Sequence, residues 1–197
     1  FDSIPPSRLI GGRDIVVGKD LRGKRLCLVV IVGDDQFRRA MGSIGRFSRR
    51  PRLAMRDMAA VLEEQTEDNF DAEGRPKWAA LSETTVRARL GGSKAYKKGG
   101  QLRKSAQRAK GDMKILQDSG LLAGSVHSQF GDDYTMIGAA RPYARIHQLG
   151  GKAGRGRKVT IPARPYLPFT PDFKLQPEAE KALLQTAMDH LRRAAAE

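Results

Sequence analysis

Residues 51–71 read PRLAMRDMAAVLEEQTEDNFD and carry the clearest structural signal in the chain. Met55, Met58 and Leu62 recur at three- and four-residue steps and Phe70 continues the stripe, while charged residues occupy the opposite face. Pro51 stands where a first helical turn tolerates proline. This pattern predicts an amphipathic helix of about five turns that ends between residues 71 and 74.

A second amphipathic stripe closes the chain, where Ala179, Leu183, Ala187 and Leu191 share one face. Glu178 and Glu180 precede this stripe, in the first turn, where the helix dipole favours acidic side chains. The chain is therefore expected to contain two long amphipathic helices, one near the middle and one at the end.

Shorter signals lie outside these helices. The β-branched run Leu26–Val32 predicts a buried strand, and residues 125–130 and 134–138 flank Gly131-Asp132-Asp133 as a β-hairpin. Ser82 is expected to cap a short helix that runs through Arg89. Residues 142–149 predict a second short helix closed by Gly150, and residues 159–161 a strand. The order predicts an α+β fold, an antiparallel-leaning β-sheet with the two long helices packed on it.

Composition divides the chain into a domain with an arm and loops. Residues 1–24 mix proline, glycine and charge and are expected to form an extended N-terminal arm, with a short extended piece at Asp14–Val17. Residues 25–197 are expected to form a single α+β domain. Within that domain, residues 91–114 predict a long mobile basic loop, and residues 150–158 a second basic glycine loop.

The residues that carry out catalysis or bind metals are sparse. The lone Cys27 lies inside an apolar run, and His127, His147 and His190 are scattered without metal-ligand spacing. No phosphate-cradling or dinucleotide glycine pattern is complete. No run of about 20 apolar residues is present that would predict a membrane span. The sequence thus predicts neither an enzyme, nor a metal site, nor a cofactor, nor a membrane partner.

The net charge of +14, from 36 Lys and Arg against 22 Asp and Glu, invites a nucleic-acid interpretation. Residues 38–56 hold seven arginines before the first acid, Asp57. Residues 91–114 hold eight Lys and Arg against Asp112 alone.

These patches lack a motif that reads a DNA groove, and Tyr96 is the one aromatic residue in the 91–114 stretch. Contact with DNA would therefore be limited to its phosphate backbone. The alternative is a partner-facing surface, and the two are compatible. The candidate DNA-channel or partner-facing residues are Lys94, Lys97, Lys98, Arg103, Lys104, Arg108, Lys152, Arg155, Arg157 and Lys158.

Several ordinary residues recur in an informative order. Trp78-x-x-Leu81-Ser82-x-x-Thr85 precedes the basic stretch, and Ser119-Gly120-x-Leu122 follows it. Residues 143–151, YARIHQLGG, and residues 161–167, IPARPYL, come later. In this order the blocks resemble the virion morphogenesis (tail completion) family of Mu-like and P2-like tailed bacteriophages, over about residues 26–197. Ser119 stands where the family usually has threonine.

The resemblance implies a structural protein rather than an enzyme. Family members look like parts of the head–tail junction or the upper tail end, so the implied location is the virion, with assembly in the host cytoplasm. The implied partners are other copies of the chain in a ring expected to be six-fold, together with neck and tail proteins. A non-sequence-specific nucleic-acid-binding protein is the alternative function.

The family-motif residues have expected structural roles. Trp78 should be a buried anchor, and Gly120 and Gly150 should take positive φ angles. Tyr143 and His147, four residues apart, should pack together under the hairpin. Arg164-Pro165 should fix the approach to the last helix, with Arg164 paired to a carboxylate or to a neighbouring subunit. The full set is Trp78, Leu81, Gly120, Leu122, Gly138, Tyr143, His147, Gly150, Arg164 and Pro165.

Overall fold

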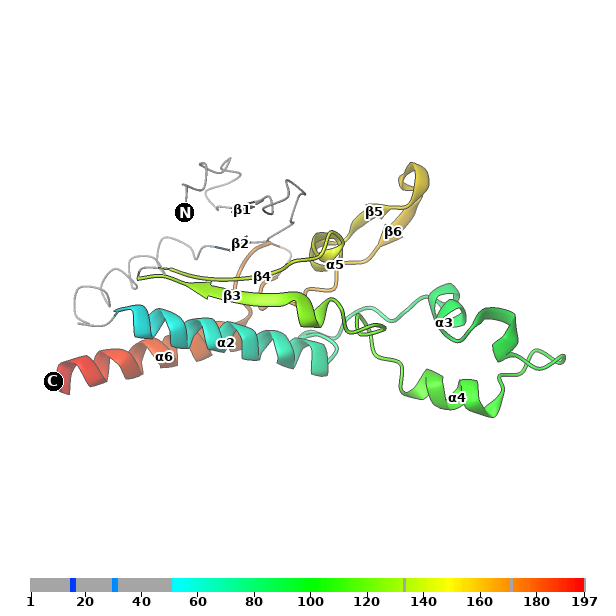
Figure 1. The fold of residues 1–197 in the computed structure, drawn as a ribbon, viewed down its shortest axis with the longest axis horizontal. Coiled ribbons are helices and arrows are strands. Elements are labelled where there is room, and N and C mark those ends of the chain that lie inside the picture. The colour runs from blue at the N-terminus through cyan, green and yellow to red at the C-terminus, as the bar shows by residue number, and fades with distance from the viewer. Residues whose placement is uncertain (1–14, 17–29, 32–50, 133, 171, 197) are drawn as a thin grey trace.

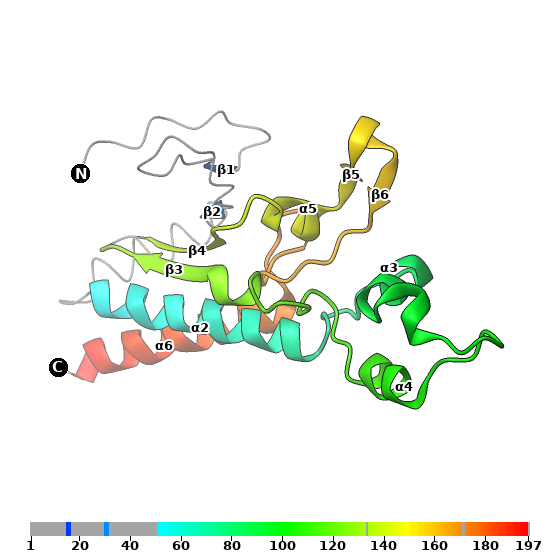
Figure 2. The same ribbon diagram turned by 45° about the vertical axis from the view of Figure 1, so that its right-hand side comes forward.

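A computed structural model gives the structure of the chain, and it describes residues 15–16, 30–31, 51–132, 134–170 and 172–196. Two long helices form its body. Helix α2 spans Pro51–Asp71 and helix α6 spans Pro177–Ala196, and they lie side by side in both views (Figures 1 and 2). A helix is thus present at each of the two predicted stretches, and each begins at a proline, in the position that lacks an intrahelical N–H partner.

The predicted apolar stripes face one another across this helix pair. Met55, Met58 and Leu62 of α2 belong to the same buried cluster as Leu183 and Ala187 of α6. A polar contact ties the pair together, because His190 Nε2 lies 3.0 Å from Asp57 Oδ2. The core thus depends on the three- and four-residue spacing visible in the sequence.

The predicted β-hairpin covers another side of α2 (Figure 1). Strand β3, Val126–Phe130, pairs antiparallel with β4, Thr135–Ala139, with Ser128 opposite Ile137. Ile137 and Ala139 are buried in the core cluster. A carboxylate oxygen of Glu63 accepts the Ser128 N–H at 2.9 Å, which fastens the hairpin to the helix.

The α+β class is confirmed, but the expected single sheet is wrong for the part of the chain described. Three separate two-stranded antiparallel pairs are present there. Strand β1, Ile15–Val16, pairs with β2, Val30–Ile31, and strand β5, Gly151–Ala153, pairs with β6, Val159–Ile161. The β3–β4 pair and the β5–β6 pair are each a local hairpin. The helix between β4 and β5 separates the two pairs, so that β5 and β6 lie away from β4 (Figure 1).

Two predictions fall largely on residues outside this description. The structure describes Ile15–Val16 of the extended piece predicted at 14–17, and it is a strand. It also describes Val30–Ile31 of the strand predicted at 26–32, again as a strand. The rest of the 1–24 arm lies outside the described residues, so its separation from residues 25–197 stays a prediction.

The 91–114 segment is not the loop that the sequence predicted. Helix α3, Glu83–Arg89, is followed by a 3-10 turn, η1, Gly92–Ala95, and by helix α4, Lys104–Gly111. Lysine, arginine, glutamine and alanine dominate α4 and are good helix formers, so high charge did not prevent a helix. We call residues 83–114 the basic lobe. It projects from the body at the end opposite the C-terminus (Figures 1 and 2).

The lobe is held by local interactions. Ser82 is the N-cap of α3, as predicted, and its hydroxyl accepts the Thr85 N–H at 3.3 Å. A β-bridge joins Tyr96 to Leu102 and closes the turn between η1 and α4. The lobe is therefore a helical unit rather than an irregular loop.

The second predicted loop, residues 150–158, is also partly regular. Helix α5, Ala144–Leu149, ends at Gly150, after which β5 and a short 3-10 turn, η3, Arg155–Arg157, lead into β6. The strand predicted at 159–161 is present as β6. Residues 151–153 of the predicted loop pair with it and form β5. We call residues 151–161 the basic hairpin.

Candidate interaction surfaces and the junction that supports them

The family motifs converge on one place, which we call the motif junction and define as residues 78–80, 147–150 and 164–169. Trp78 is buried there, and its indole Nε1–H donates to the carbonyl oxygen of Pro165 at 3.0 Å. Its ring meets Phe70 edge-on, with the centroids 6.0 Å apart. Trp78 therefore joins the end of α2 to the segment that precedes α6, which is the anchoring role expected of it.

Arg164 is positioned differently from the prediction. It is only 6% exposed, and its guanidinium donates to the carbonyl oxygens of Ala79 at 3.0 Å and Ala80 at 3.1 Å. The expected pairing with a carboxylate is wrong for the described residues, since the linker before α3 supplies unpaired carbonyls and Arg164 satisfies them. Burial, and then the nearby Arg89, lowers the pKa of Arg164.

Gln148 is the residue of the junction whose role sequence reasoning missed. It is 1% exposed, and its Oε1 accepts the backbone N–H groups of Tyr166 and Leu167, each at 3.0 Å. Its Nε2 donates to the carbonyl oxygen of Phe169 at 2.9 Å. A single amide thus satisfies three backbone groups of a segment that belongs to no helix or named strand. A glutamine four residues after Ala144, on the same face of the predicted helix, was the available signal.

Asn69 and Gln176 complete this buried polar network and were also missed. Asn69 Nδ2 donates to the carbonyl oxygen of Tyr166 at 3.1 Å and to Gln176 Oε1 at 2.9 Å. Arg75 Nε donates to Asn69 Oδ1 at 2.9 Å. The end of α2, the junction and the start of α6 are therefore connected by hydrogen bonds, a contact across about a hundred residues that no local pattern reveals.

Tyr143 and His147 do contact each other, but not under the β3–β4 hairpin. Their rings meet edge-on with centroids 5.8 Å apart, while Tyr143 remains 40% exposed. The expected packing is wrong because the buried face of α5 carries Ala144 and Gln148 instead. Burial, and then the charges of Arg164 and Arg89, lowers the pKa of His147 below 6.5.

The remaining motif residues lie in the core or at tight turns of the backbone. Leu122 is buried, Leu81 packs against the core, and Gly138 is buried within β4 opposite His127. Gly120 and Gly150 have positive φ angles of 67° and 71°, as expected. At Gly150 a Cβ atom would lie 2.8 Å from the Ala163 nitrogen, so the site also lacks space for a side chain.

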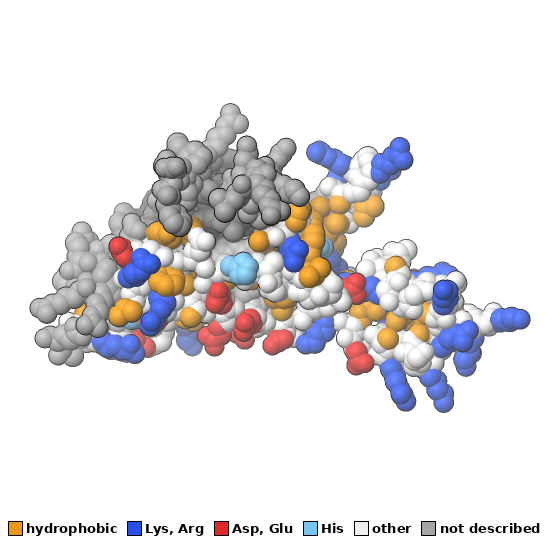
Figure 3. All heavy atoms as spheres, viewed as in Figure 1, with side chains coloured by type: hydrophobic (Ala, Val, Ile, Leu, Met, Phe, Trp, Pro, Cys, Tyr) orange, Lys and Arg blue, Asp and Glu red, His pale blue; other side chains and the backbone are white. Residues whose placement is uncertain are grey.

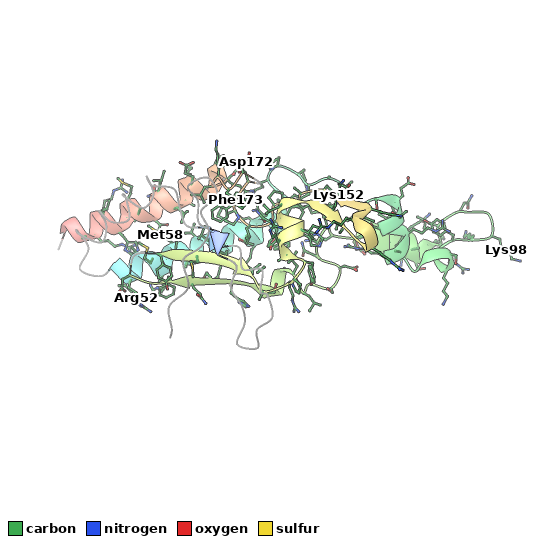
Figure 4. The ribbon with its side chains drawn as sticks, turned by 90° about the horizontal axis from the view of Figure 1, so that it is seen from above. Arg52, Met58, Lys98, Lys152, Asp172 and Phe173 are labelled. Carbon is green, nitrogen blue, oxygen red and sulfur yellow. The ribbon has the colours of Figure 1, made fainter. Side chains whose placement is uncertain are left out.

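The basic lobe presents an array of exposed cations. Figure 3 shows them gathered at the end of the molecule, and Figure 4 places Lys98 at its far tip. Among the described residues, none of these cations takes part in an ion pair or donates a side-chain hydrogen bond: Lys94, Lys97, Lys98, Arg103, Lys104, Arg108 and Lys110. Ordered cations without internal partners are available to an external anionic surface.

The lobe's only aromatic side chain is Tyr96, and its ring already contacts another residue of the lobe. The Arg87 guanidinium carbon lies 5.3 Å from the centre of the Tyr96 ring, a cation–π contact within the lobe. Tyr96 is partly buried, and its backbone forms the bridge to Leu102.

The basic hairpin forms a second, separate projection. Lys152, Arg155, Arg157 and Lys158 are exposed along it, and Val159 is 57% exposed beside them. Figures 1 and 2 show the hairpin and the lobe extending from the body in different directions, and Figure 4 places Lys152 well away from Lys98. The ten predicted basic residues therefore form two surfaces rather than one site.

The third predicted basic patch, residues 38–56, is described only from residue 51 onward. There Arg52 lies 3.5 Å from Asp132 and over the Phe130 ring, and Arg56 donates twice to Asp57. Both arginines are thus engaged within the body, and the others of the patch lie outside the described residues.

The titratable residues of the described chain do not form a metal-binding cluster. No group of three or more His, Cys, Asp or Glu side chains that could hold a metal ion occurs there. In that same part of the chain, no helix combines the length and apolarity needed to cross a bilayer. Cys27 lies outside the described residues.

Comparison with known proteins identifies the class of this chain. The model of the phage virion morphogenesis family matches residues 32–192, and the chain belongs to that family. This confirms the resemblance drawn from the sequence motifs.

Three relatives illustrate the family. Two Haemophilus influenzae proteins, Mu-like prophage FluMu G protein 2 and Mu-like prophage FluMu G protein 1, are 36% and 35% identical over 117 residues, which is 59% and 57% of this chain. The matches span 65% and 64% of those proteins, just under two thirds of their length. "Putative capsid assembly protein G" of Escherichia phage Mu is 32% identical over 133 residues, which is 65% of this chain and 74% of that protein. No solved structure matched the chain.

Proposed function

We propose that this protein is a structural virion protein of a tailed bacteriophage that forms a ring at the tail's upper end or the head–tail junction. In that position it completes the tail or joins it to the filled head. Family membership over residues 32–192 carries the proposal, and the relatives' names place those proteins in Mu-like phages and, for phage Mu, in capsid assembly.

The shape of the subunit supports assembly into a ring. A closed ring of identical subunits needs two different surfaces that fit one another, so that each copy contacts the next in the same sense. The basic hairpin, with Val159 exposed, offers one projecting surface. Helix α6 offers another, because Leu184 and Met188 are four residues apart and about half exposed. These two surfaces lie on different parts of the molecule (Figures 1 and 2).

Electron microscopy of phage particles tests this function. Particles assembled without the protein should accumulate as unjoined heads and tails. Subunit-resolution images of complete particles should show a closed ring of this chain, six-fold by expectation, at the neck or upper tail end. Density for the chain in the capsid shell instead would contradict the proposal, and so would normal joining in its absence.

A free nucleic-acid-binding protein is the second candidate, favoured by the unpaired cations of the basic lobe. The two functions differ in location. A free binding protein would remain in the lysate after particles are removed, whereas a virion protein would be retained in purified particles at a fixed copy number. Quantitative immunoblotting of purified particles separates the two.

A further inference from the structure

The basic lobe is a preformed surface, and this determines which partner it fits. Ser82 caps α3, a β-bridge joins Tyr96 to Leu102, and α4 follows directly, so the cations of the lobe are carried on regular structure before any partner binds. Binding to such a surface does not require the ordering of a mobile loop, which would weaken the association.

The charge balance of the lobe points to a polyanion. Residues 83–114 contain ten Lys and Arg against Glu83 and Asp112. Two of the ten form ion pairs, since Arg89 lies 3.5 Å from Asp118 and Lys114 lies 3.8 Å from Asp71. A third, Arg87, contacts the Tyr96 ring. Seven others have exposed side chains without ion pairs in the described chain, a density suited to regularly spaced phosphates.

The environment of Tyr96 argues against the binding of single-stranded nucleic acid, whose bases are unstacked. Proteins that bind single strands stack bases on exposed aromatic rings. Tyr96 is the only aromatic residue between 83 and 114, and it is partly buried with Arg87 against its ring. The lobe therefore offers charge without a stacking platform, which suits the outside of a duplex.

The charge of the neighbouring helix α2 also favours the lobe as the contact for a polyanion. Residues 57–73 contain seven Asp and Glu and no Lys or Arg. Figure 3 shows acidic and basic side chains interspersed along the body, whereas basic side chains predominate at the lobe and the hairpin tip. A duplex would be attracted to the basic lobe and repelled by the acidic stretch at residues 57–73, so the lobe is favoured over α2 as its contact.

We propose that the basic lobe binds the phosphate backbone of double-stranded DNA without reading its bases. This inference rests on the proposed function, because it assigns the lobe of an assembly protein to DNA and leaves the hairpin to protein contacts. It is tested on the free full-length chain, so its outcome is independent of where the protein lies in a particle.

The test uses fluorescence anisotropy with a labelled duplex of about 30 base pairs, titrated between about 50 and 200 mM salt. The lobe variant carries Lys97→Gln, Lys98→Gln, Arg103→Gln and Lys104→Gln. The matched control carries Lys152→Gln, Arg155→Gln, Arg157→Gln and Lys158→Gln in the hairpin. Both variants have the same net charge, 14 − 4 = +10, and all eight side chains are exposed.

The lobe variant should bind the duplex at least about tenfold more weakly, and the slope of log affinity against log salt should fall by up to about 4. The hairpin variant should change affinity by less than about threefold, the part due to net charge alone. Scrambling the duplex sequence should leave binding unchanged. A single strand of equal length should bind no more tightly than the duplex.

Three results would overturn the assignment. Equal losses in the two variants would show that net charge, not the lobe, drives binding. Tenfold tighter binding to the single strand would require base stacking that this surface does not offer. Salt-sensitive self-association abolished in the lobe variant only, with no duplex binding by the unmodified protein, would assign the lobe to a second copy of the chain. None of these results bears on whether the protein lies at the neck, which the microscopy decides.

Discussion

The body and the basic lobe belong to the same chain but are held together in different ways. The body encloses large side chains such as Met55, Met58, Ile137 and Tyr166. Within residues 83–114 only Ala95 and Ala106 are buried, and alanine contributes little apolar area. The body is therefore stabilised by its core and by the polar network at the motif junction, whereas the lobe depends on capping, helix propensity and surface contacts. Substitutions in the two regions should differ accordingly.

The largest effect is expected at Gln148. Gln148→Leu would leave the Tyr166 and Leu167 N–H groups and the Phe169 carbonyl without partners in a buried place. Each buried unsatisfied group costs about 1–3 kcal/mol, so the free energy of unfolding should fall by about 4 kcal/mol in urea titrations.

The control for this prediction is Gln185→Leu on the exposed face of α6. It removes only a surface contact to Asp189 and should change the free energy of unfolding by less than about 0.5 kcal/mol. Similar losses in the two variants would show that the buried network does not hold the junction.

A pair of glycines sharpens the comparison between body and lobe. Gly150 and Gly100 both have positive φ angles, 71° and 77°, so alanine costs about 1–3 kcal/mol of backbone strain at either. Gly150→Ala should cost more, about 3 kcal/mol, since the new Cβ would meet the Ala163 nitrogen at 2.8 Å, whereas Gly100 has open space. Thermal unfolding of both variants measures the difference, and equal shifts would contradict the crowding at Gly150.

The motif junction should also make stability depend on pH. The folded pKa of His147 lies below 6.5, mainly through burial, so below that pH the unfolded chain binds the proton more readily. The stability contributed by neutral His147 is present above about pH 6.5 and is lost as the pH falls below it.

The measurement compares urea midpoints at about pH 7.5 and 5.5 for the unmodified protein and for His147→Gln. The variant should lose less stability on acidification. A pH dependence unchanged by the substitution would show that His147 is not the titrating group.

The smallest effect is expected in the lobe. Arg87→Ala removes the cation–π contact with Tyr96 and should cost about 0.5 kcal/mol. Hydrogen exchange should accelerate in α3 and α4 while the α2 amides remain unchanged, because the lobe shares few contacts with the body. Faster exchange throughout would mean that lobe and body unfold as one unit.

Local patterns predicted much of the fold. The stripes of α2 and α6, the Ser82 cap, the β3–β4 hairpin and the Gly150 helix end all follow from periodicity or from the conformational limits of single residues. Prediction failed where charge was equated with disorder, as in residues 91–114, because lysine and arginine favour helices when like charges are spread over an exposed surface. It also failed for the single sheet, since strand pairing beyond a local hairpin depends on contacts distant in sequence.

The sequence by itself determined the family, through ordered motifs, together with the amphipathic helices and the basic character of two segments. Only the tertiary structure decided what the motif residues do. Gln148 and Arg164 satisfy backbone groups far along the chain, and a side chain's hydrogen-bond partner depends on where folding brings the chain together. The structure likewise separated the cations into a lobe and a hairpin, because their directions follow from the packing of the elements beneath them rather than from their order along the chain.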